Sequence, residues 1–307
     1  MPNTQKLYND LNSFLRDKFG GKVYKVSIDA GFTCPNLDGK ISKDGCIFCN
    51  NESIFPKGHD RTKEPIVQLE EGIEYIKKRH KADKFIAYLQ PFSNTYASLG
   101  ALKKIYDPLI KSDQIVALAA STRPDCVNDE VLDYLETLQR EKYLWLELGL
   151  QSSHSGTLKR INRGHSYGDF LKAFGKATER RIDVCVHIIL GLPEETPKMM
   201  IETVKKLSTL GIFGIKMHSL HVLKNTKLCE EYLKGDIKLM DLDSYVNTVV
   251  KCLEVMDPKI VIHRLTGEGP KELTVAPNWV LNKLAVLNAV KAELLKKGSY
   301  QGIKFEL

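Results

Sequence analysis

The feature that most constrains the fold is a regular alternation between short apolar runs and longer segments with helical periodicity. The apolar runs lie at Val23–Ile28, Phe85–Gln90, Ile115–Ala120, Leu144–Leu150, Ile182–Leu190, Gly214–Leu220 and Lys259–Leu265. The helical segments lie at 4–19, Pro65–Lys81, Leu99–Lys111, Asp129–Arg140, Tyr167–Arg180, Pro197–Leu210, Leu242–Met256 and Trp279–Lys297. Strands that alternate with helices indicate βαβ units and a parallel sheet. Six or seven such units predict an α/β fold, a partial (β/α)6-type TIM barrel.

No linker rich in Pro, Gly or Ser divides the chain, so we expect one barrel with short extensions. The predicted parts are an N-terminal helix at 1–22, a barrel core at 23–265 and a C-terminal helical extension at 266–307 that packs on the barrel. The 307 residues are enough to bury a large core. The oligomeric state is left open by the sequence.

The composition indicates a cytoplasmic protein that does not enter a membrane. No apolar run approaches the ~20 residues of a membrane span, and the N-terminus lacks the apolar region of a signal peptide. The seven cysteines are an odd number and four are widely scattered, which does not favour a disulfide framework. The net charge of +7 fits a polyanionic partner such as RNA, although many proteins of that charge bind no nucleic acid.

Three cysteines follow the first apolar run. Cys34, Cys46 and Cys49 lie within sixteen residues, and the last two form a C-x-x-C pair. Three thiolates brought together suit an iron–sulfur cluster or zinc. A structural zinc site needs four ligands, for which Cys126 or His59 is a candidate. A redox pair would leave Cys34 without a role. The spacing alone favours a cluster and leaves zinc open.

Polar and uncommon side chains gather at the C-terminal ends of the predicted strands, where (β/α) barrels carry their active groups. They include Gln90, Ser93, Thr95, Arg123, Glu147, Gln151, His187, His218, His221, His263 and Arg264. Any one of them can be explained as turn chemistry. Their joint position predicts an active site at this end of the barrel.

Several stretches of the chain resemble the radical SAM superfamily. They are GFTCPN, DGCIFCNN, STRPDCV, LWLELGLQS, RINRGH, HIILGLPEET and IKMHSLHVLK. The eleven residues between Cys34 and Cys46 depart from the usual C-x3-C-x2-C spacing of that superfamily. A long first gap is similar to the YtqA/YhcC-type family, which is related to the radical SAM domain of the elongator catalytic subunit.

The resemblance implies two cofactors, a 4Fe–4S cluster and S-adenosylmethionine (SAM). Cys34, Cys46 and Cys49 would hold the cluster, and the iron without a protein ligand would bind the amino and carboxylate groups of SAM. A one-electron reductant of the flavodoxin or ferredoxin type would reduce the cluster. Cleavage of SAM would then give a 5′-deoxyadenosyl radical that takes a hydrogen atom from the substrate.

The same resemblance implies contacts to the charged end of SAM. Gln90, Ser93 and Thr95 stand where many members of the superfamily carry Gly-Gly-Glu, and they are candidates for the methionyl ammonium. Arg163 is the first candidate for the methionyl carboxylate and Arg123 the second, because a guanidinium can hold a carboxylate with two hydrogen bonds.

The nucleoside of SAM needs partners of a different kind. Glu147 and Gln151 are candidates for the ribose hydroxyls. Phe48, Gly191 and Leu220 are candidates for the flat, largely apolar adenine. Glu147 also has a structural interpretation, as a barrel-core carboxylate paired with a neighbour, and the two arginines can likewise be read as structural ion pairs.

Four histidines fall at predicted strand ends. His187, His218, His221 and His263 are each more often structural than catalytic, but together they predict at least one substrate contact. Arg264 beside them is a candidate for binding a phosphate or a carboxylate. Beyond these candidates the catalytic residues are left open.

The leading functional hypothesis is a radical SAM enzyme that acts on tRNA, in the modification of the C5 side chain of the wobble uridine. A second hypothesis keeps the radical chemistry and assigns a small-molecule or protein substrate. A third, of a different class, is a zinc-stabilised RNA-binding protein without catalytic activity.

Overall fold

The computed structural model describes residues 6–50, 53, 60 and 62–306, so the candidate ligand His59 lies outside the described residues. The strands are β1 (Val23–Ile28), β2 (Lys84–Leu89), β3 (Ile115–Thr122), β4 (Tyr143–Gln151), β5 (Asp183–Leu190), β6 (Gly214–Ser219), β7 (Val222–Leu223), β8 (Val261–Arg264) and β9 (Thr274–Ala276). The α-helices are α1 (Leu11–Phe19), α2 (Pro65–Arg79), α3 (Leu99–Lys111), α4 (Asp129–Gln139), α5 (Ser155–Arg160), α6 (Tyr167–Glu179), α7 (Pro197–Thr209), α8 (Lys227–Leu233), α9 (Leu242–Glu254) and α10 (Lys283–Lys296). The short 3-10 helices η2 (Pro124–Cys126) and η3 (Asn278–Leu281) are also present.

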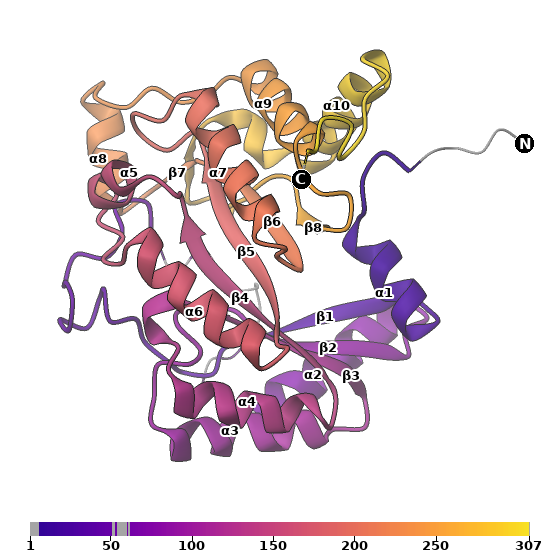
Figure 1. The fold of residues 1–307 in the computed structure, drawn as a ribbon. Helices are drawn as coiled ribbons and strands as arrows, with labels where there is room; N and C mark the ends of the chain where they lie inside the picture. The colour runs from indigo at the N-terminus through magenta and orange to yellow at the C-terminus, as the bar shows by residue number, and fades with distance from the viewer. Residues whose placement is uncertain (1–5, 51–52, 54–59, 61, 307) are drawn as a thin grey trace, which may run out of the picture.

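The main sheet has seven parallel strands in the order β1-β2-β3-β4-β5-β6-β8. It curls on itself, and the helices between the strands cover its outer face (Figure 1). The predicted α/β partial barrel is therefore confirmed, and β8 is its seventh strand. Strands β1 and β8 are the two edges of this sheet, which does not close.

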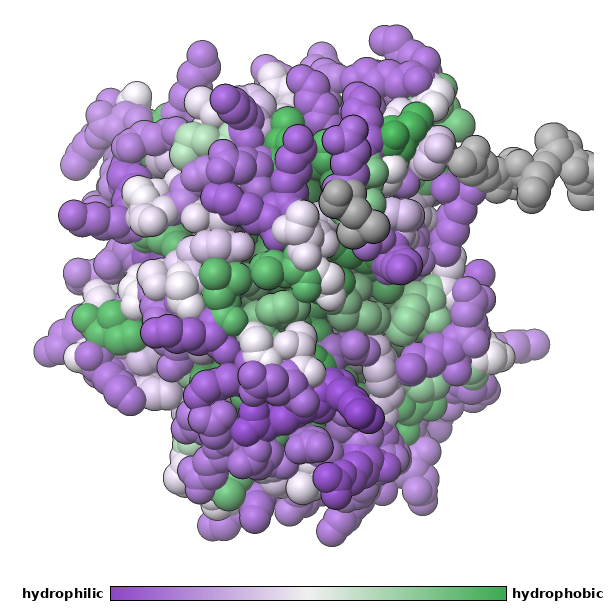
Figure 2. Space-filling view, viewed as in Figure 1, coloured by the Kyte–Doolittle hydropathy of each residue, from purple (hydrophilic) through white to green (hydrophobic). Residues whose placement is uncertain are grey.

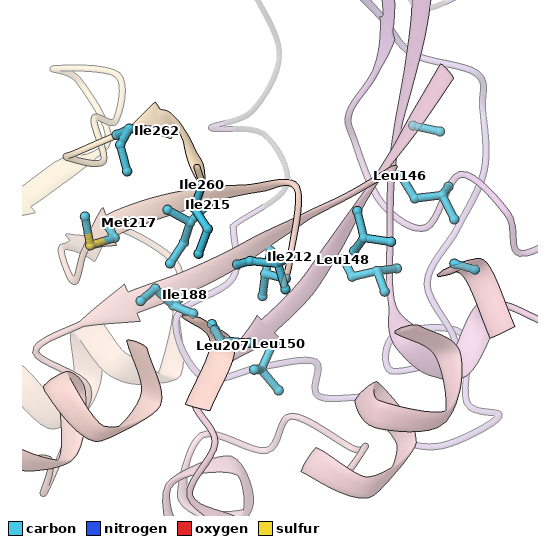
Figure 3. Packing of buried hydrophobic residues seen from close by; sticks show 14 of the residues in the cluster. Leu146, Leu148, Leu150, Ile188, Leu207, Ile212, Ile215, Met217, Ile260 and Ile262 are labelled. Carbon is cyan, nitrogen blue, oxygen red and sulfur yellow. The ribbon is translucent and has the colours of Figure 1, made fainter. Parts of the chain in front are cut away.

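The side chains of each strand alternate between the helices and the barrel interior, as the period of two requires. In β4, Leu146, Leu148 and Leu150 point to one side and pack in the large hydrophobic core under the helices (Figure 3). Trp145 and Glu147 alternate with them and face the interior, where Trp145 belongs to a separate cluster. The side chains that β4 directs into the barrel interior are therefore those of its odd-numbered residues.

Helix α1 packs against the interior at the N-terminal ends of the strands. Its Leu15 is buried with Trp145, and its Phe14 contacts Phe213 with ring centroids 5.1 Å apart. The helix is shorter than the predicted 4–19, because Asp10 caps it by accepting a hydrogen bond from the Ser13 amide at 3.0 Å. The segment before it lies along β8 instead, where the Asn9 carbonyl accepts a 2.7 Å hydrogen bond from the Ile262 amide.

The C-terminal part lies beside α9. Helix α10 runs next to α9 (Figure 1), and Lys297 donates a 3.0 Å hydrogen bond to Asn247. It begins at Lys283 rather than at the predicted Trp279, because Asn282 caps it and the preceding residues form η3. Helices α5 and α8 and the antiparallel pair β7–β9 were not predicted.

The face shown in Figure 2 is covered largely by hydrophilic residues, with a band of hydrophobic residues across its middle. Within the described residues, no helix combines the length and the apolar character needed to cross a membrane.

Candidate active site

A cavity of about 450 Å³ opens at the C-terminal ends of the strands. The three loop cysteines line it together with most of the predicted site residues. These are Phe48, Gln90, Ser93, Arg123, Glu147, Gln151, Arg163, His187, His218, Leu220, His221 and Arg264. Three predicted residues, Thr95, Gly191 and His263, do not line the cavity.

The cysteine loop is held by its own backbone and by the turn at 161–164. The Cys34 carbonyl accepts hydrogen bonds from the amides of residues 37 and 38, at 2.8 and 3.1 Å. The Cys49 amide donates to the Cys46 carbonyl at 2.9 Å. Two side-chain donors approach the Cys46 sulfur, Asn36 Nδ2 at 3.6 Å and Arg163 Nη1 at 3.5 Å. The loop therefore presents three thiols at one end of the cavity.

The loop thiols fit a group larger than one metal ion. Two ligands of a single zinc ion, each about 2.3 Å from the metal, lie within about 4.6 Å of each other. Among the described His, Cys, Asp and Glu side chains, the trio whose donor atoms all lie within 4.8 Å is Glu147, Cys185 and His263, which includes none of the loop cysteines. The spacing of the three sulfurs is therefore too wide for a closed mononuclear site.

The electrostatics of the loop also fit a metal cluster. Burial, followed by the charges of Cys46 and Cys34, raises the pKa of the Cys49 thiol to about 12. A metal binds the thiolate form and supplies positive charge that stabilises it. Cys126, the candidate fourth ligand, lies in η2, where burial raises the pKa of its thiol to about 12. It does not line the cavity.

Two arginines lie beside the cysteines with unused donors. Arg123 holds Asp125 through two hydrogen bonds, of 2.9 and 3.0 Å, and donates a third to the Arg163 carbonyl. Arg163 donates to the Gly149 carbonyl at 2.5 Å. Arg123 Nη1 and Arg163 Nε are buried and have no hydrogen-bond partner among the described residues. These donors are suited to an anionic group in the cavity, such as a carboxylate.

Gly149 makes room for this arrangement. A Cβ atom at that position would lie 2.7 Å from Arg163 Nη2 and 2.9 Å from Gln151 Nε2. Gln151 has a φ of 77°, an uncommon conformation for a residue other than glycine, at a register shift between β4 and β5. Gln151 lines the cavity at this shift, on the side of β4 that alternation with Trp145 and Glu147 predicts.

The predicted ammonium contacts separate into two groups. Gln90 and Ser93 line the cavity, and Gln90 donates a 3.0 Å hydrogen bond to Ser27. Thr95 is buried in the wall, where its hydroxyl bonds to the Thr122 hydroxyl at 2.6 Å and to the Cys126 carbonyl at 2.7 Å. Both hydroxyl contacts of Thr95 are satisfied within the protein, so its role is in packing the wall.

The predicted adenine contacts also separate. Leu220 is buried in a hydrophobic cluster against which Phe48 packs, and both line the cavity. Gly191 is outside the lining, in a left-handed turn with φ of 87° that faces the side chain of Met240. An apolar platform for a flat ring is therefore available from Phe48 and Leu220.

Glu147 is the centre of a buried polar network. It pairs with Lys216 and, at 3.6 Å, with Lys25. Its carboxylate also accepts hydrogen bonds from Tyr88 at 2.7 Å and Trp145 at 3.1 Å. Its environment holds the pKa of Glu147 well below its usual range, because the two lysines outweigh the burial that acts in the opposite direction. The structural interpretation of Glu147 fits this geometry better than a ribose contact.

The four histidines lie at two depths. His187, His218 and His221 line the cavity, and the rings of the first two are 5.4 Å apart. His263 is buried below them, against the edges of Trp145 and Phe213. Burial lowers the pKa of His187 to about 4 and that of His263 to about 3. All four imidazoles are neutral near pH 7, since the pKa values of His218 and His221 are also lowered by burial.

Sequence reasoning missed three residues of this network, Lys25, Tyr88 and Lys216. Each lies within an apolar run, at a position that faces the barrel interior. A lysine inside a buried strand is uncommon and needs an acidic partner, so the lysines in VYKVSI and GIKMHSL, set beside Glu147, carried a usable signal. Asn36, which contacts Cys46, carried no comparable signal.

The chain matches two family models. The radical SAM superfamily matches residues 42–207, and the radical SAM C-terminal domain matches residues 212–296. YtqA of Bacillus subtilis is 42% identical over 304 residues, which cover 99% of this chain and 94% of that protein. YhcC of Escherichia coli is 34% identical over 280 residues, which cover 91% and 89%. The chain belongs to the radical SAM superfamily, and the resemblance to the YtqA/YhcC-type family is confirmed.

More distant matches agree on the fold. A tRNA uridine(34) acetyltransferase of Methanocaldococcus infernus is 25% identical over 163 residues, covering 52% of this chain and 30% of that enzyme. The structure of the Elp3 protein of the same organism superposes with a TM-score of 0.69 at 19% identity, covering 91% of this chain and 64% of the other. Membership of the superfamily makes this chain an enzyme whose cofactors are a 4Fe–4S cluster and SAM.

Proposed function

We propose that this enzyme uses radical SAM chemistry to modify the C5 side chain of the wobble uridine of tRNA. The observation that carries the chemistry is the cavity that joins three widely spaced thiols to two arginines with unused donors. The tRNA substrate is supported by the similarity of half of the chain to an enzyme named for tRNA uridine 34. A one-electron reductant of the flavodoxin or ferredoxin type completes the proposal.

The residues take the following roles. Cys34, Cys46 and Cys49 hold the cluster, which supplies together with SAM a 5′-deoxyadenosyl radical. Arg163 and Arg123 bind the methionyl carboxylate with the donors that no described residue uses. The walls of the cavity exclude water from the reacting atoms, as a radical of this kind requires.

The remaining cavity residues hold the rest of SAM. Gln90 and Ser93 lie toward the methionyl ammonium, and Gln151 lies toward the ribose. The adenine stacks on the apolar platform that Phe48 and Leu220 form.

The cluster assignment is tested by matched cysteine variants of the anaerobically purified protein. We expect the wild type to be brown, to contain about four irons and to form 5′-deoxyadenosine from SAM when reduced. Cys34→Ala should lose the iron and the colour. Cys126→Ala should keep both, because that thiol does not line the cavity. A colourless wild type with one zinc, or iron lost in Cys126→Ala, would contradict the assignment.

The substrate is tested by nucleoside mass spectrometry of tRNA from a strain that lacks the gene. We expect a precursor of the wobble uridine to accumulate, and the wild-type gene to restore the product while the Cys34→Ala gene does not. An unchanged wobble-uridine profile would rule out this substrate and direct attention to a small-molecule or protein substrate.

A further inference from the structure

One layer of residues in the barrel interior ends at Arg264, an arginine to which the proposed function assigns no contact with the cluster or SAM. Backbone pairing across β4, β5, β6 and β8 aligns Gly149 with His187, His187 with Lys216, and Lys216 with Arg264. Parallel strands in register place such side chains at one height in a barrel. We call these four residues the arginine layer.

A register shift in β8 brings Arg264 into this layer. Ile215 pairs with Ile262, but the next residue, Lys216, pairs with Arg264, so His263 is an extra residue between them. Bulges of this kind redirect side chains and are frequent beside active sites. As a result His263 lies in the buried core near Gly214, while Arg264 reaches the lining of the cavity.

No acidic side chain that the structure describes pairs with Arg264. Lys216, its neighbour in the layer, is paired with Glu147. Glu268 also lines the cavity, but it pairs with Lys283 at 3.1 Å. Among the described residues, none forms a hydrogen bond or an ion pair with the half-buried Arg264 guanidinium.

Arg264 and His218 line the same cavity from adjacent strands. Arg264 in β8 pairs in register with Lys216 in β6, two residues before His218. His218 Nε2 is buried and has no hydrogen-bond partner among the described residues. An unpaired guanidinium beside a buried, unsatisfied ring nitrogen is costly unless a ligand completes both.

We propose that Arg264 and His218 form a subsite for one anionic oxygen group of the substrate, a carboxylate or a phosphate. A guanidinium binds either group with two parallel hydrogen bonds, and a neutral imidazole adds a third donor. The subsite lies on β6 and β8 rather than on the elements that carry Arg123 and Arg163. As a statement about tRNA, the inference rests on the proposed function.

Binding of small anions tests the subsite without an identified substrate. The probes are ¹³C-labelled acetate and inorganic phosphate, titrated against cluster-loaded, SAM-saturated enzyme and followed by NMR line broadening. We expect saturable binding by the wild type and binding weaker by about 10-fold or more in Arg264→Gln, because a charge-assisted hydrogen bond is lost. Arg264→Lys keeps the charge but loses the two parallel hydrogen bonds, so its binding should be weaker than that of the wild type and stronger than that of Arg264→Gln.

The controls separate loss of the subsite from loss of the fold. Iron content establishes that each variant is loaded, and Arg264→Lys provides a second variant if Arg264→Gln does not fold. Arg140→Gln removes an exposed arginine on the far side of α4 and should bind both anions as the wild type does. Absence of saturable binding in the wild type, or equal binding by Arg264→Gln, overturns the proposal.

Two tRNA samples identify the source of the anion. One is tRNA from the deletion strain, which carries the substrate nucleoside, and the other is an unmodified transcript of the same sequence. If Arg264→Gln binds both tRNAs more weakly than the wild type does, and the salt dependence of tRNA binding falls by about one phosphate contact, the anion belongs to the RNA backbone. Weaker binding of the cellular tRNA alone assigns it to the side chain of the nucleoside.

If the proposed function is wrong and the subsite is real, the same binding experiments give a different result. In that case the wild type binds neither tRNA, while acetate or phosphate binding still depends on Arg264. This result supports the subsite and transfers it to a different substrate with an anionic group.

Discussion

At the scale of single residues, the polar groups in the interior of this barrel are organised around one carboxylate, that of Glu147. Glu147 is fully buried and serves two lysines and four neutral donors, which are Tyr88, Ser121, Trp145 and His187. A buried ion pair is not by itself a large source of stability, because both charges give up their hydration. Removal of one partner leaves the other charge buried and alone, which is the costly change.

Lys216→Met should therefore be strongly destabilising. We expect a loss of about 3–5 kcal/mol in the free energy of unfolding, measured by urea denaturation, because Glu147 is left without its closest cation. The double variant Lys216→Met/Glu147→Gln should recover part of that loss. Lys206→Met is the control, since its ion pair with Glu202 is exposed and should contribute about 0.5 kcal/mol or less. A loss of similar size in both lysine variants would contradict this account.

The sequence predicted most of these residues as members of one site but not their partners. The cysteines and Arg264 are chemically distinctive and follow predicted strands, so position along the chain was enough to group them, whereas Arg163 was predicted from the resemblance of the RINRGH stretch. The roles of Glu147 and Thr95 could not be predicted, because each is decided by neighbours far away in the sequence, such as Lys216 and Cys126. The register shift between β4 and β5 at Gln151 could not be predicted either, because no periodicity reveals it.

At the scale of elements, the two ends of the chain meet at the edge strand β8. Asn9 lies along this strand, and the Gln301 side chain joins the two. It accepts a hydrogen bond from the Asn9 amide at 2.8 Å and donates to the carbonyls of Asp257 and Ile260 at 2.8 and 2.9 Å. These bonds join the segment around Asn9 to the residues that precede β8, beside a sheet edge whose unpaired backbone groups would invite pairing with other chains.

Gln301→Ala should destabilise the protein by about 2–3 kcal/mol, since one buried and two part-buried backbone groups lose a partner at once. The measurement is the urea midpoint, with Lys296→Ala as a control on the exposed side of α10, where a change of about 0.5 kcal/mol or less is expected. Equal midpoints for Gln301→Ala and the wild type would show that solvent replaces these contacts freely.

The strands and the long helices could be predicted because each repeats its pattern over enough residues. β1 and α3 have the predicted bounds. Helix α5 and strands β7 and β9 are too short to display a period. The start of α1 was wrong because Asp10 is both a cap and a bridge to Ile262, and the second contact is set by the tertiary structure.

At the scale of the whole molecule, the barrel is covered at one end and open at the other. Helix α1 and its aromatic side chains cover the N-terminal end, while the cavity opens at the C-terminal end. The polar layers between them bury several imidazoles that the folded protein keeps neutral. The pKa is lowered to about 3 for His165 and His263 and to about 4 for His187.

This burial predicts that stability falls as the pH is lowered from 6.5 toward 4. In that window the unfolded chain binds protons at these histidines and the folded chain does not, so the free energy of unfolding rises with pH. Each histidine contributes up to about 1.4 kcal/mol per pH unit. The measurement is the urea midpoint at several pH values. His263→Gln should reduce the slope by about one proton, and an unchanged slope would contradict this origin.

The cysteine loop and the turn at 161–164 are joined by hydrogen bonds. Asn36 donates to the Asn162 carbonyl at 2.7 Å, Asn162 donates to the Gly45 carbonyl at 2.6 Å, and Arg163 contacts Cys46. In the proposed function Cys46 holds the cluster and Arg163 binds SAM, so ordering of either site would order the other. Such coupling is reciprocal, so the factor by which SAM would strengthen retention of iron equals the factor by which iron would strengthen binding of SAM. A chain without iron would then bind SAM more weakly, and bound SAM would protect the metal.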